Sequence, residues 1–149
     1  MGTLGEIAIG AAATLAAWWF RYTCRVARRS ARRDYTADVA RANQLEFLEV
    51  QRALMATPPA SQLASLAKKL EQDYRMLSYL LRHGPALQAF RVRIEQRMVM
   101  LNFQLLKAYF AVTRTVLRTK GRRALEEMAQ VVGYLANQMG ARAASPAGR

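Results

Sequence analysis

The segment from Leu4 to Arg33 constrains the fold most, because its first half is apolar and its second half is basic. No charged residue occurs between Ile7 and Phe20. Aromatic rings and then arginines follow without an intervening acid: Trp18, Trp19, Tyr22, Arg21, Arg25, Arg28, Arg29, Arg32 and Arg33. This order is typical of a helix that enters a bilayer, with rings at the interface and guanidinium groups among lipid phosphates. The sequence therefore predicts a transmembrane helix with a basic juxtamembrane stop in residues 1–33.

The length of this segment is just sufficient for a span. As a helix, residues 3–24 would rise about 33 Å, against roughly 30 Å for a hydrocarbon core. The strictly uncharged run covers only 14 residues, and at that length a buried core helix or an interfacial segment is the alternative. Large side chains project to one side of the helix and small ones to most of the rest. The small residues are predicted to form a face for a partner helix: Gly5, Gly10, Ala12, Ala13, Ala16 and Ala17.

The charge of the chain predicts an anionic partner. The net charge is +13, with 19 arginines against 4 lysines, so lipid headgroups or nucleic acid are the candidate partners. The basic residues follow the apolar run, whereas a cleavable signal peptide has them in front. The arginine asymmetry places the N-terminus outside and the C-terminus in the cytoplasm, as expected for a bacterial inner-membrane protein.

The remainder of the chain is predicted to be an all-α domain over residues 34–140, a small bundle or hairpin of long amphipathic helices. Turn signals at Thr57-Pro58-Pro59, His83-Gly84-Pro85 and Gly121 delimit helices at about 34–56, 61–83, 86–120 and 122–140. Because no Gly or Pro lies between Arg25 and Asp34, the first helix is expected to continue into the second or to bend mildly. The alternative is a separate second helix that is capped by Asp34 or Thr36. Residues 141–149 are interpreted as a flexible tail.

Apolar residues spaced by three and four predict the packing faces of these helices. They are Leu63, Leu66, Leu70, Tyr74, Leu77, Leu81, Leu101, Leu105, Val112, Leu125, Val132 and Leu135. The stretch from Met98 to Val112 is apolar nearly all round, which is typical of the central helix of a bundle. A second membrane-embedded segment, with Lys107 snorkelling, is the alternative for the same stretch.

Residues that carry chemistry are scarce. The chain has one histidine and one cysteine, so a nucleophilic site of the Ser-His or Cys-His type would rest on a single candidate residue. The spacing of nearby residues supports neither type of site. A phosphate loop, a dinucleotide fingerprint and the Glu-x-x-His pairs of di-iron bundles are absent from the sequence. His83 is interpreted as a helix-end residue. We therefore expect no enzyme activity, no cofactor and no metal.

These features together predict a non-catalytic accessory, structural or assembly subunit of a larger multi-subunit membrane complex, of which an energy-transducing complex is one candidate. Its apolar helix faces would contact other membrane-protein subunits, and its arginines would contact anionic lipid headgroups. The alternative is a soluble or peripheral basic helical bundle that binds nucleic acid, with Ile7–Phe20 as its buried helix. Nucleic acid is the less favoured partner, because Trp18 and Trp19 lie away from the basic helix ends.

Overall fold

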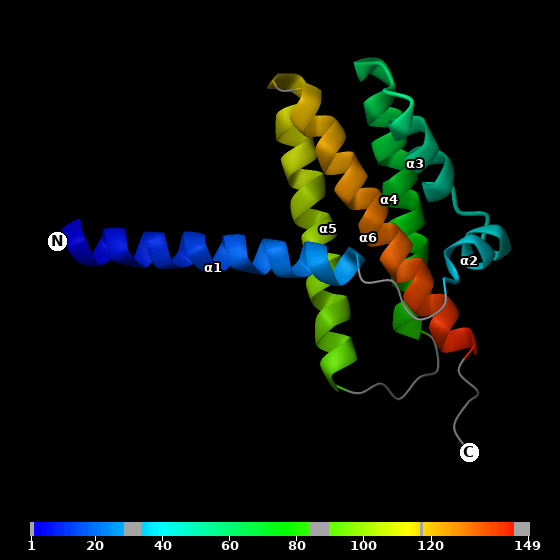
Figure 1. Cartoon of the computed structure of the whole chain (residues 1–149), viewed down its shortest axis with the longest axis horizontal. Helices are drawn as coiled ribbons and strands as arrows, with labels where there is room; N and C mark the ends of the chain where they lie inside the picture. The colour runs from blue at the N-terminus through cyan, green and yellow to red at the C-terminus, as the bar shows by residue number, and fades with distance from the viewer. Residues whose placement is uncertain (1, 29–33, 84–89, 117, 145–149) are drawn as a thin grey trace.

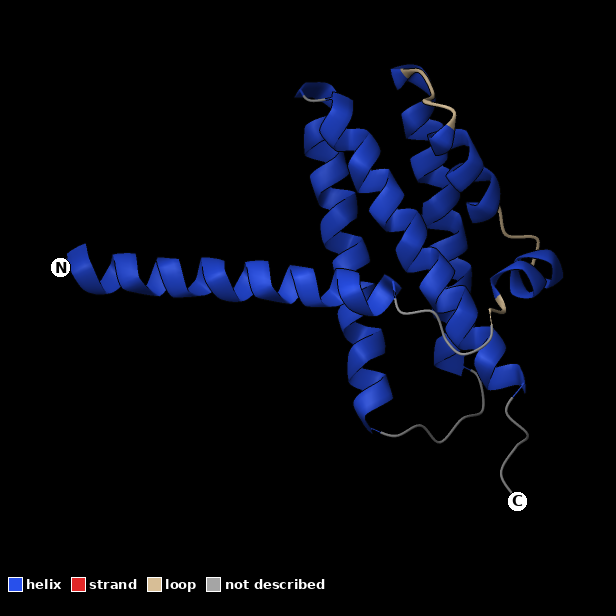
Figure 2. Cartoon of the chain, viewed as in Figure 1, coloured by secondary structure: helices blue, strands red, loops and turns tan. Residues whose placement is uncertain are grey.

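The computed structural model describes residues 2–28, 34–83, 90–116 and 118–144. These residues form six helices and no strand (Figures 1 and 2). The helices are α1 (Gly2–Arg28), α2 (Thr36–Ala42), α3 (Phe47–Met55), α4 (Ala60–His83), α5 (Phe90–Val116) and α6 (Arg118–Ala144). The predicted all-α class is confirmed.

Helix α6 is the centre of the bundle. Each of the other five helices contacts α6, whereas α4 and α5 contact each other along only a short stretch. Residues on several sides of α6 are almost fully buried, including Leu125, Ala129, Val131 and Leu135. The expectation that the segment 98–112 would be central is therefore corrected. In the view of Figure 1, α5 lies on one side of α6 and α2 and α3 lie on the other, while α4 contacts α6, α3 and α5.

Helix α5 buries only one of its two apolar faces. Val99, Phe103, Leu106 and Phe110 are at most 4% exposed and point into the core. The face that the sequence predicted to pack is on the outside instead: Leu101 is 51% exposed, Leu105 53% and Val112 70%. The apolar pattern could not select the inward face, because both faces of this segment are apolar. The bulk of Phe103 and Phe110 favours the face that carries them, since aromatic side chains bury the largest area.

The long helix α4 packs through the residues that the spacing indicated. Leu63, Leu66, Leu70, Tyr74, Leu77 and Leu81 are all buried, as are Leu125, Val132 and Leu135 on α6. The Tyr74 ring stacks on the Phe103 ring with centroids 4.0 Å apart, and its hydroxyl donates to the Met100 carbonyl at 3.2 Å. At the rim of the same contact, the Lys107 ammonium donates to Glu71 Oε1 at 2.5 Å. These contacts join α4 to α5.

The predicted helix 34–56 is two helices. A turn at Asn43–Glu46 separates α2 from α3, and Gln44 there has a positive φ of 53°. The N-terminus of α3 is capped by a residue that is distant in the sequence. Asp73 Oδ2 on α4 accepts hydrogen bonds from the backbone N–H groups of Glu46 (2.8 Å) and Phe47 (2.6 Å). A break of this kind depends on a tertiary contact, which local sequence patterns do not contain.

The last helix is longer than predicted at both ends. Gly121, expected to end a helix, lies inside α6, and residues 141–144 belong to α6 and not to a tail. Arg142 anchors this end: its guanidinium donates to the Leu81 carbonyl (3.3 Å) and to Gln96 Oε1 (2.5 Å). Helix α6 is thereby joined to both α4 and α5. The remaining tail residues, 145–149, lie outside the described part of the chain.

Helix α1 projects from the bundle and meets it only near its C-terminal end, where it contacts α5 and α6 (Figure 1). Asp34 and Tyr35 are not helical, so α1 does not form one rod with α2. Among the described residues, α1 included, no helix combines the length and the apolar character that crossing a bilayer requires. The predicted transmembrane helix is therefore not supported. Half of its uncharged run of 14 residues is alanine or glycine, which contributes little apolar area.

Candidate functional site: a projecting helix and a basic groove

The projecting part of α1 exposes large apolar side chains. Ile7 is 67% exposed, Ile9 72%, Leu15 65% and Trp18 63%. The small residues that were predicted to meet a partner helix are exposed as well, namely Gly10, Ala12, Ala13, Ala16 and Ala17. A Cβ atom added at Gly10 would meet nothing within 4 Å, and the surroundings of Gly5 are outside the described residues. The segment Ile7–Phe20 is therefore not the buried helix that the nucleic-acid alternative requires.

The aromatic residues at the end of this run mark the transition from the projecting arm to the bundle. Trp18 and Tyr22 stack with ring centroids 5.8 Å apart, and Tyr22 is half-buried and packs against the core. Trp19 is also half-buried. Of the rings that were predicted to lie at a lipid interface, Trp18 is exposed to solvent, whereas Tyr22 packs against the protein core. A tyrosine with one end packed and one end wet suits both settings, so sequence could not separate them.

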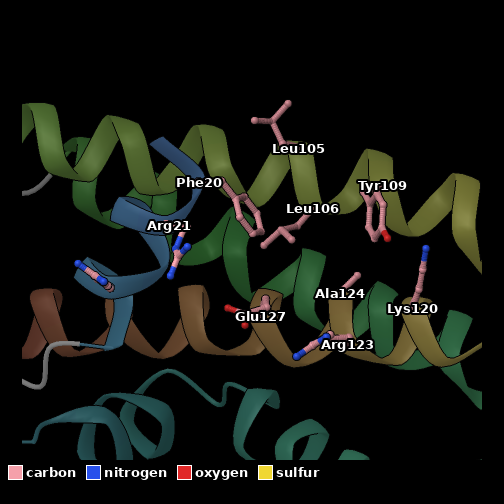
Figure 3. A pocket seen from close by; sticks show the side chains of 10 residues that line it. Phe20, Arg21, Leu105, Leu106, Tyr109, Lys120, Arg123, Ala124 and Glu127 are labelled. Carbon is pink, nitrogen blue, oxygen red and sulfur yellow. The ribbon is translucent and has the colours of Figure 1, made fainter. Parts of the chain in front are cut away.

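Where α1 meets the bundle, a groove of about 930 Å³ opens between α1, α5 and α6 (Figure 3). Its apolar lining consists of Phe20, Leu105, Leu106 and Ala124. Four cationic side chains, one carboxylate and one phenol complete it: Arg21, Arg25, Lys120, Arg123, Glu127 and Tyr109. Of the arginines predicted to contact headgroups, Arg21 and Arg25 belong to this groove. The side chain of Arg28, and all of Arg29, Arg32 and Arg33, lie outside the described residues.

Helical spacing explains how each helix contributes to the groove. Arg21 and Arg25 are four residues apart and therefore share one face of α1. On α5, Leu105 and Tyr109 are also four apart, and both are about half exposed. Leu106 and Ala124 are buried and form the floor. Figure 3 shows Phe20 directed toward Leu106, and Tyr109 directed from α5 toward α6.

The groove is electropositive. Four cationic side chains stand against one carboxylate in its lining, and they border a low-dielectric apolar wall, which strengthens their field in the hollow. Lysine and arginine give charge-assisted hydrogen bonds to phosphate and carboxylate groups. The cations of the described lining therefore suit the binding of an anion. Among the described residues, no cluster of three His, Cys, Asp or Glu side chains could hold a metal ion.

Sequence reasoning found two of the four groove cations and missed the groove. The missing information is topological: the start of α6, with Lys120 and Arg123, lies beside the base of α1 about 100 residues earlier. The basic cluster from Lys120 to Arg123 is visible in the sequence, where it falls at the predicted boundary between the helices at 86–120 and 122–140. That it faces Arg21 and Arg25 follows only from the crossing of α1 over α5 and α6 (Figure 1).

Comparison of the chain with protein-family models, with curated proteins and with solved structures gives no match.

Proposed function

We propose that this chain is a non-catalytic accessory or assembly subunit of a larger membrane complex, and that it binds partner subunits through α1 and through the outer face of α5. The observation that carries the proposal is the exposure of Ile7, Ile9, Leu15 and Trp18 on a helix that projects from the bundle. Burying a large apolar side chain contributes about 1.5–3 kcal/mol. A partner that covers these residues therefore gains several kcal/mol from them.

The stability of α1 itself supports a partner. Isolated helices are marginal in water, and most helices in proteins are stabilised by tertiary packing of an apolar face. The arm from Ile7 to Trp18 packs neither of its faces on the described bundle. Its alanines and Gly10 favour the close approach of another helix, because small side chains let two backbones come near each other.

The outer face of α5 extends this surface. It carries an apolar stripe formed by residues spaced along one side of the helix, which are between 39% and 70% exposed: Ile94, Leu101, Leu105, Tyr109 and Val112. Leu105 also lines the groove with Phe20, so the stripe adjoins the base of α1. Contiguous apolar patches of this kind mark protein interaction sites.

The location that accompanies this proposal is the cytoplasmic face of a bacterial inner membrane. Its support is the net charge of +13 and the acid-free arginine cluster between Arg21 and Arg33. Anionic lipids attract such clusters with about 1 kcal/mol for each residue near the surface. In this proposal, the chain contacts the membrane complex through the projecting helix α1 and through the side of the bundle that carries the basic groove.

The experiment compares two triple variants of the tagged full chain in native complexes purified in mild detergent. The arm variant is Ile7→Ser, Ile9→Ser and Leu15→Ser. Its control changes three exposed apolar residues elsewhere, Met55→Ser, Met76→Ser and Tyr79→Ser, which are 80%, 47% and 61% exposed. Partner subunits should co-elute in fixed stoichiometry with the wild type and the control, and be lost with the arm variant.

An arm variant that keeps the same partners and the same complex mass would contradict the proposal. Circular dichroism of each purified variant checks that the bundle stays folded. The nucleic-acid alternative has its own signature, which is salt-dependent retention of RNA or DNA by the purified chain. Retention that persists in the arm variant and disappears above physiological salt would favour that alternative.

A further inference from the structure

We propose that the basic groove between α1, α5 and α6 binds one anionic lipid, with its headgroup among the cations that line the groove and the start of an acyl chain on the apolar wall. The proposal deepens the function proposed above and rests on it for the membrane location. It concerns a different surface from the projecting arm, because Ile7, Ile9 and Leu15 do not line the groove.

The two walls of the groove differ in chemistry, and this difference selects an amphiphile. Helix α6 supplies Lys120 and Arg123, while α5 supplies Leu105, Leu106 and Tyr109 (Figure 3). A free phosphate would use the cations and leave the apolar wall wet. A neutral apolar compound would leave the excess of cations over carboxylates in the lining unbalanced. A phospholipid satisfies both walls, since its headgroup is anionic and its chain is apolar.

The number and type of cations match a phosphate headgroup. Arg21 and Arg25 approach from α1, and Lys120 and Arg123 approach from α6. Guanidinium groups bind phosphate through two parallel hydrogen bonds, and lysine binds it as a compact charge. Among the described lining residues Glu127 is the one carboxylate, so their balance of charge favours an anion.

The size of the groove favours a single small ligand over a nucleic acid. Its volume of about 930 Å³ falls in the ordinary range of roughly 300–1,000 Å³ for small-molecule sites. A long single strand instead needs an extended basic track with stacking platforms, and a duplex needs several phosphate contacts along its backbone. The described cations of this site line one hollow at the crossing of three helices, with Arg21 toward one end and Lys120 toward the other (Figure 3).

Calorimetric titration of the purified full chain tests the proposal. The probe is a short-chain phosphatidylglycerol, used below its critical micelle concentration so that single lipids are measured. Phosphatidylcholine of the same chain length, inorganic phosphate and a single-stranded RNA oligonucleotide are titrated in parallel. We expect one phosphatidylglycerol per chain, and at least about tenfold weaker binding of phosphatidylcholine and of inorganic phosphate.

Matched charge variants locate the site. The groove variant is Arg21→Gln, Arg25→Gln, Lys120→Gln and Arg123→Gln. Its control removes the same charges from exposed residues of α2, α3 and α4: Arg41→Gln, Arg52→Gln, Lys68→Gln and Arg82→Gln. Affinity for phosphatidylglycerol should fall at least about tenfold in the groove variant, and less than threefold in the control. The double variant Arg21→Gln, Arg25→Gln gives the same test if the quadruple variant unfolds.

Several outcomes overturn the proposal. Equal affinity of the groove and control variants would place the lipid elsewhere. Binding of inorganic phosphate as tight as that of the lipid would make the groove a simple anion site, and competition by RNA would make it a nucleic-acid site. Absence of lipid binding refutes the lipid site alone, because the arm variant tests assembly separately. The arm variant Ile7→Ser, Ile9→Ser, Leu15→Ser should itself bind the lipid like wild type.

Discussion

Gly140 of α6 lies directly against Tyr35, so closely that a Cβ atom on Gly140 would be 2.2 Å from the Tyr35 Cβ and 2.8 Å from its Cγ. One turn earlier on α6, Asn137 Oδ1 accepts a hydrogen bond of 2.9 Å from the Tyr35 backbone N–H. Together these two contacts seat the start of α2 on the backbone of α6. The absence of a side chain at residue 140 is thus a packing requirement.

The variant Gly140→Ala is expected to destabilise the fold by about 1–3 kcal/mol, because overpacking of this size forces the two helices apart. Thermal unfolding followed by circular dichroism measures the change. Gly133→Ala is the matched control in the same helix, where an added Cβ would lie 3.6 Å from the Phe47 ring, an ordinary contact. Alanine has the higher helix propensity, so the control should be as stable as wild type or up to about 1 kcal/mol more stable. Equal effects of both substitutions would contradict the packing role of Gly140.

Replacing Asn102 with leucine is expected to stabilise the bundle by about 1 kcal/mol or more. Asn102 is 1% exposed, and neither its side-chain nitrogen nor its side-chain oxygen has a hydrogen-bond partner among the described residues. A buried polar group without a partner costs about 1–3 kcal/mol. Asn137→Leu is the contrasting variant, since it breaks the hydrogen bond to Tyr35 and should destabilise. Urea titrations of both variants give the free energies, and a loss of stability in Asn102→Leu would show that the amide has a partner after all.

The sequence carried enough information for the helical class and for the packing face of α4, where apolar and polar residues segregate clearly. It did not do so for α5, because residues 98–112 are apolar on both sides and either Leu101 or Phe103 could face inward. The break between α2 and α3 was equally hidden, since it depends on the Asp73 carboxylate from α4. Local patterns predict elements, and the contacts between elements decide faces and boundaries.

The same distinction applies to the candidate site: features within one helix could be predicted, and contacts between helices could not. The arm was predictable as a helix with an apolar and a small-residue face, and its arginines as an anion-binding cluster. Its interpretation as a span relied on length and order of residues, and the structure does not support it. The groove could not be predicted, because Arg21 and Arg123 are brought to one hollow by the crossing of α1 over the bundle.

Asp73 should give the protein an unusual dependence of stability on pH. Burial raises the pKa of its carboxyl above the ordinary 3.8, and this outweighs the two backbone hydrogen bonds at the start of α3, which lower it. A raised folded-state pKa means that the stability contribution is complete below 3.8 and is lost as pH rises through the folded value. The free energy of unfolding of wild type relative to Asp73→Asn should therefore decrease as pH rises from about 4 toward neutrality. An increase over this interval would show that the hydrogen bonds prevail over burial.

The contribution of Glu71 to stability is expected to depend on pH in the opposite sense. Its hydrogen bond with Lys107 is the largest of the effects that lower its pKa below 4.5, and Arg75 adds to them. A lowered folded-state pKa gives stability that is present above 4.5 and is lost as pH falls through the folded value. Since the pair is partly exposed, Glu71→Gln should cost only about 0.5 kcal/mol at neutral pH and nothing near pH 2. Chemical denaturation at several pH values tests this, with Glu49→Gln as the exposed control.

The two faces of α5 should respond differently to substitution, and this comparison tests both the fold and the proposed partner surface. On the outer face, Leu101→Gln with Val112→Gln should change the free energy of unfolding by no more than about 1 kcal/mol, because both side chains are already more than half exposed. On the inner face, Phe103→Ala alone should cost about 3–5 kcal/mol, since Phe103 is fully buried. The outer-face variant should nevertheless lose partner subunits from the native complex while its melting temperature stays within a few degrees of wild type. If it unfolds instead, Leu101 and Val112 belong to the core of the bundle and the apolar stripe is not a partner surface.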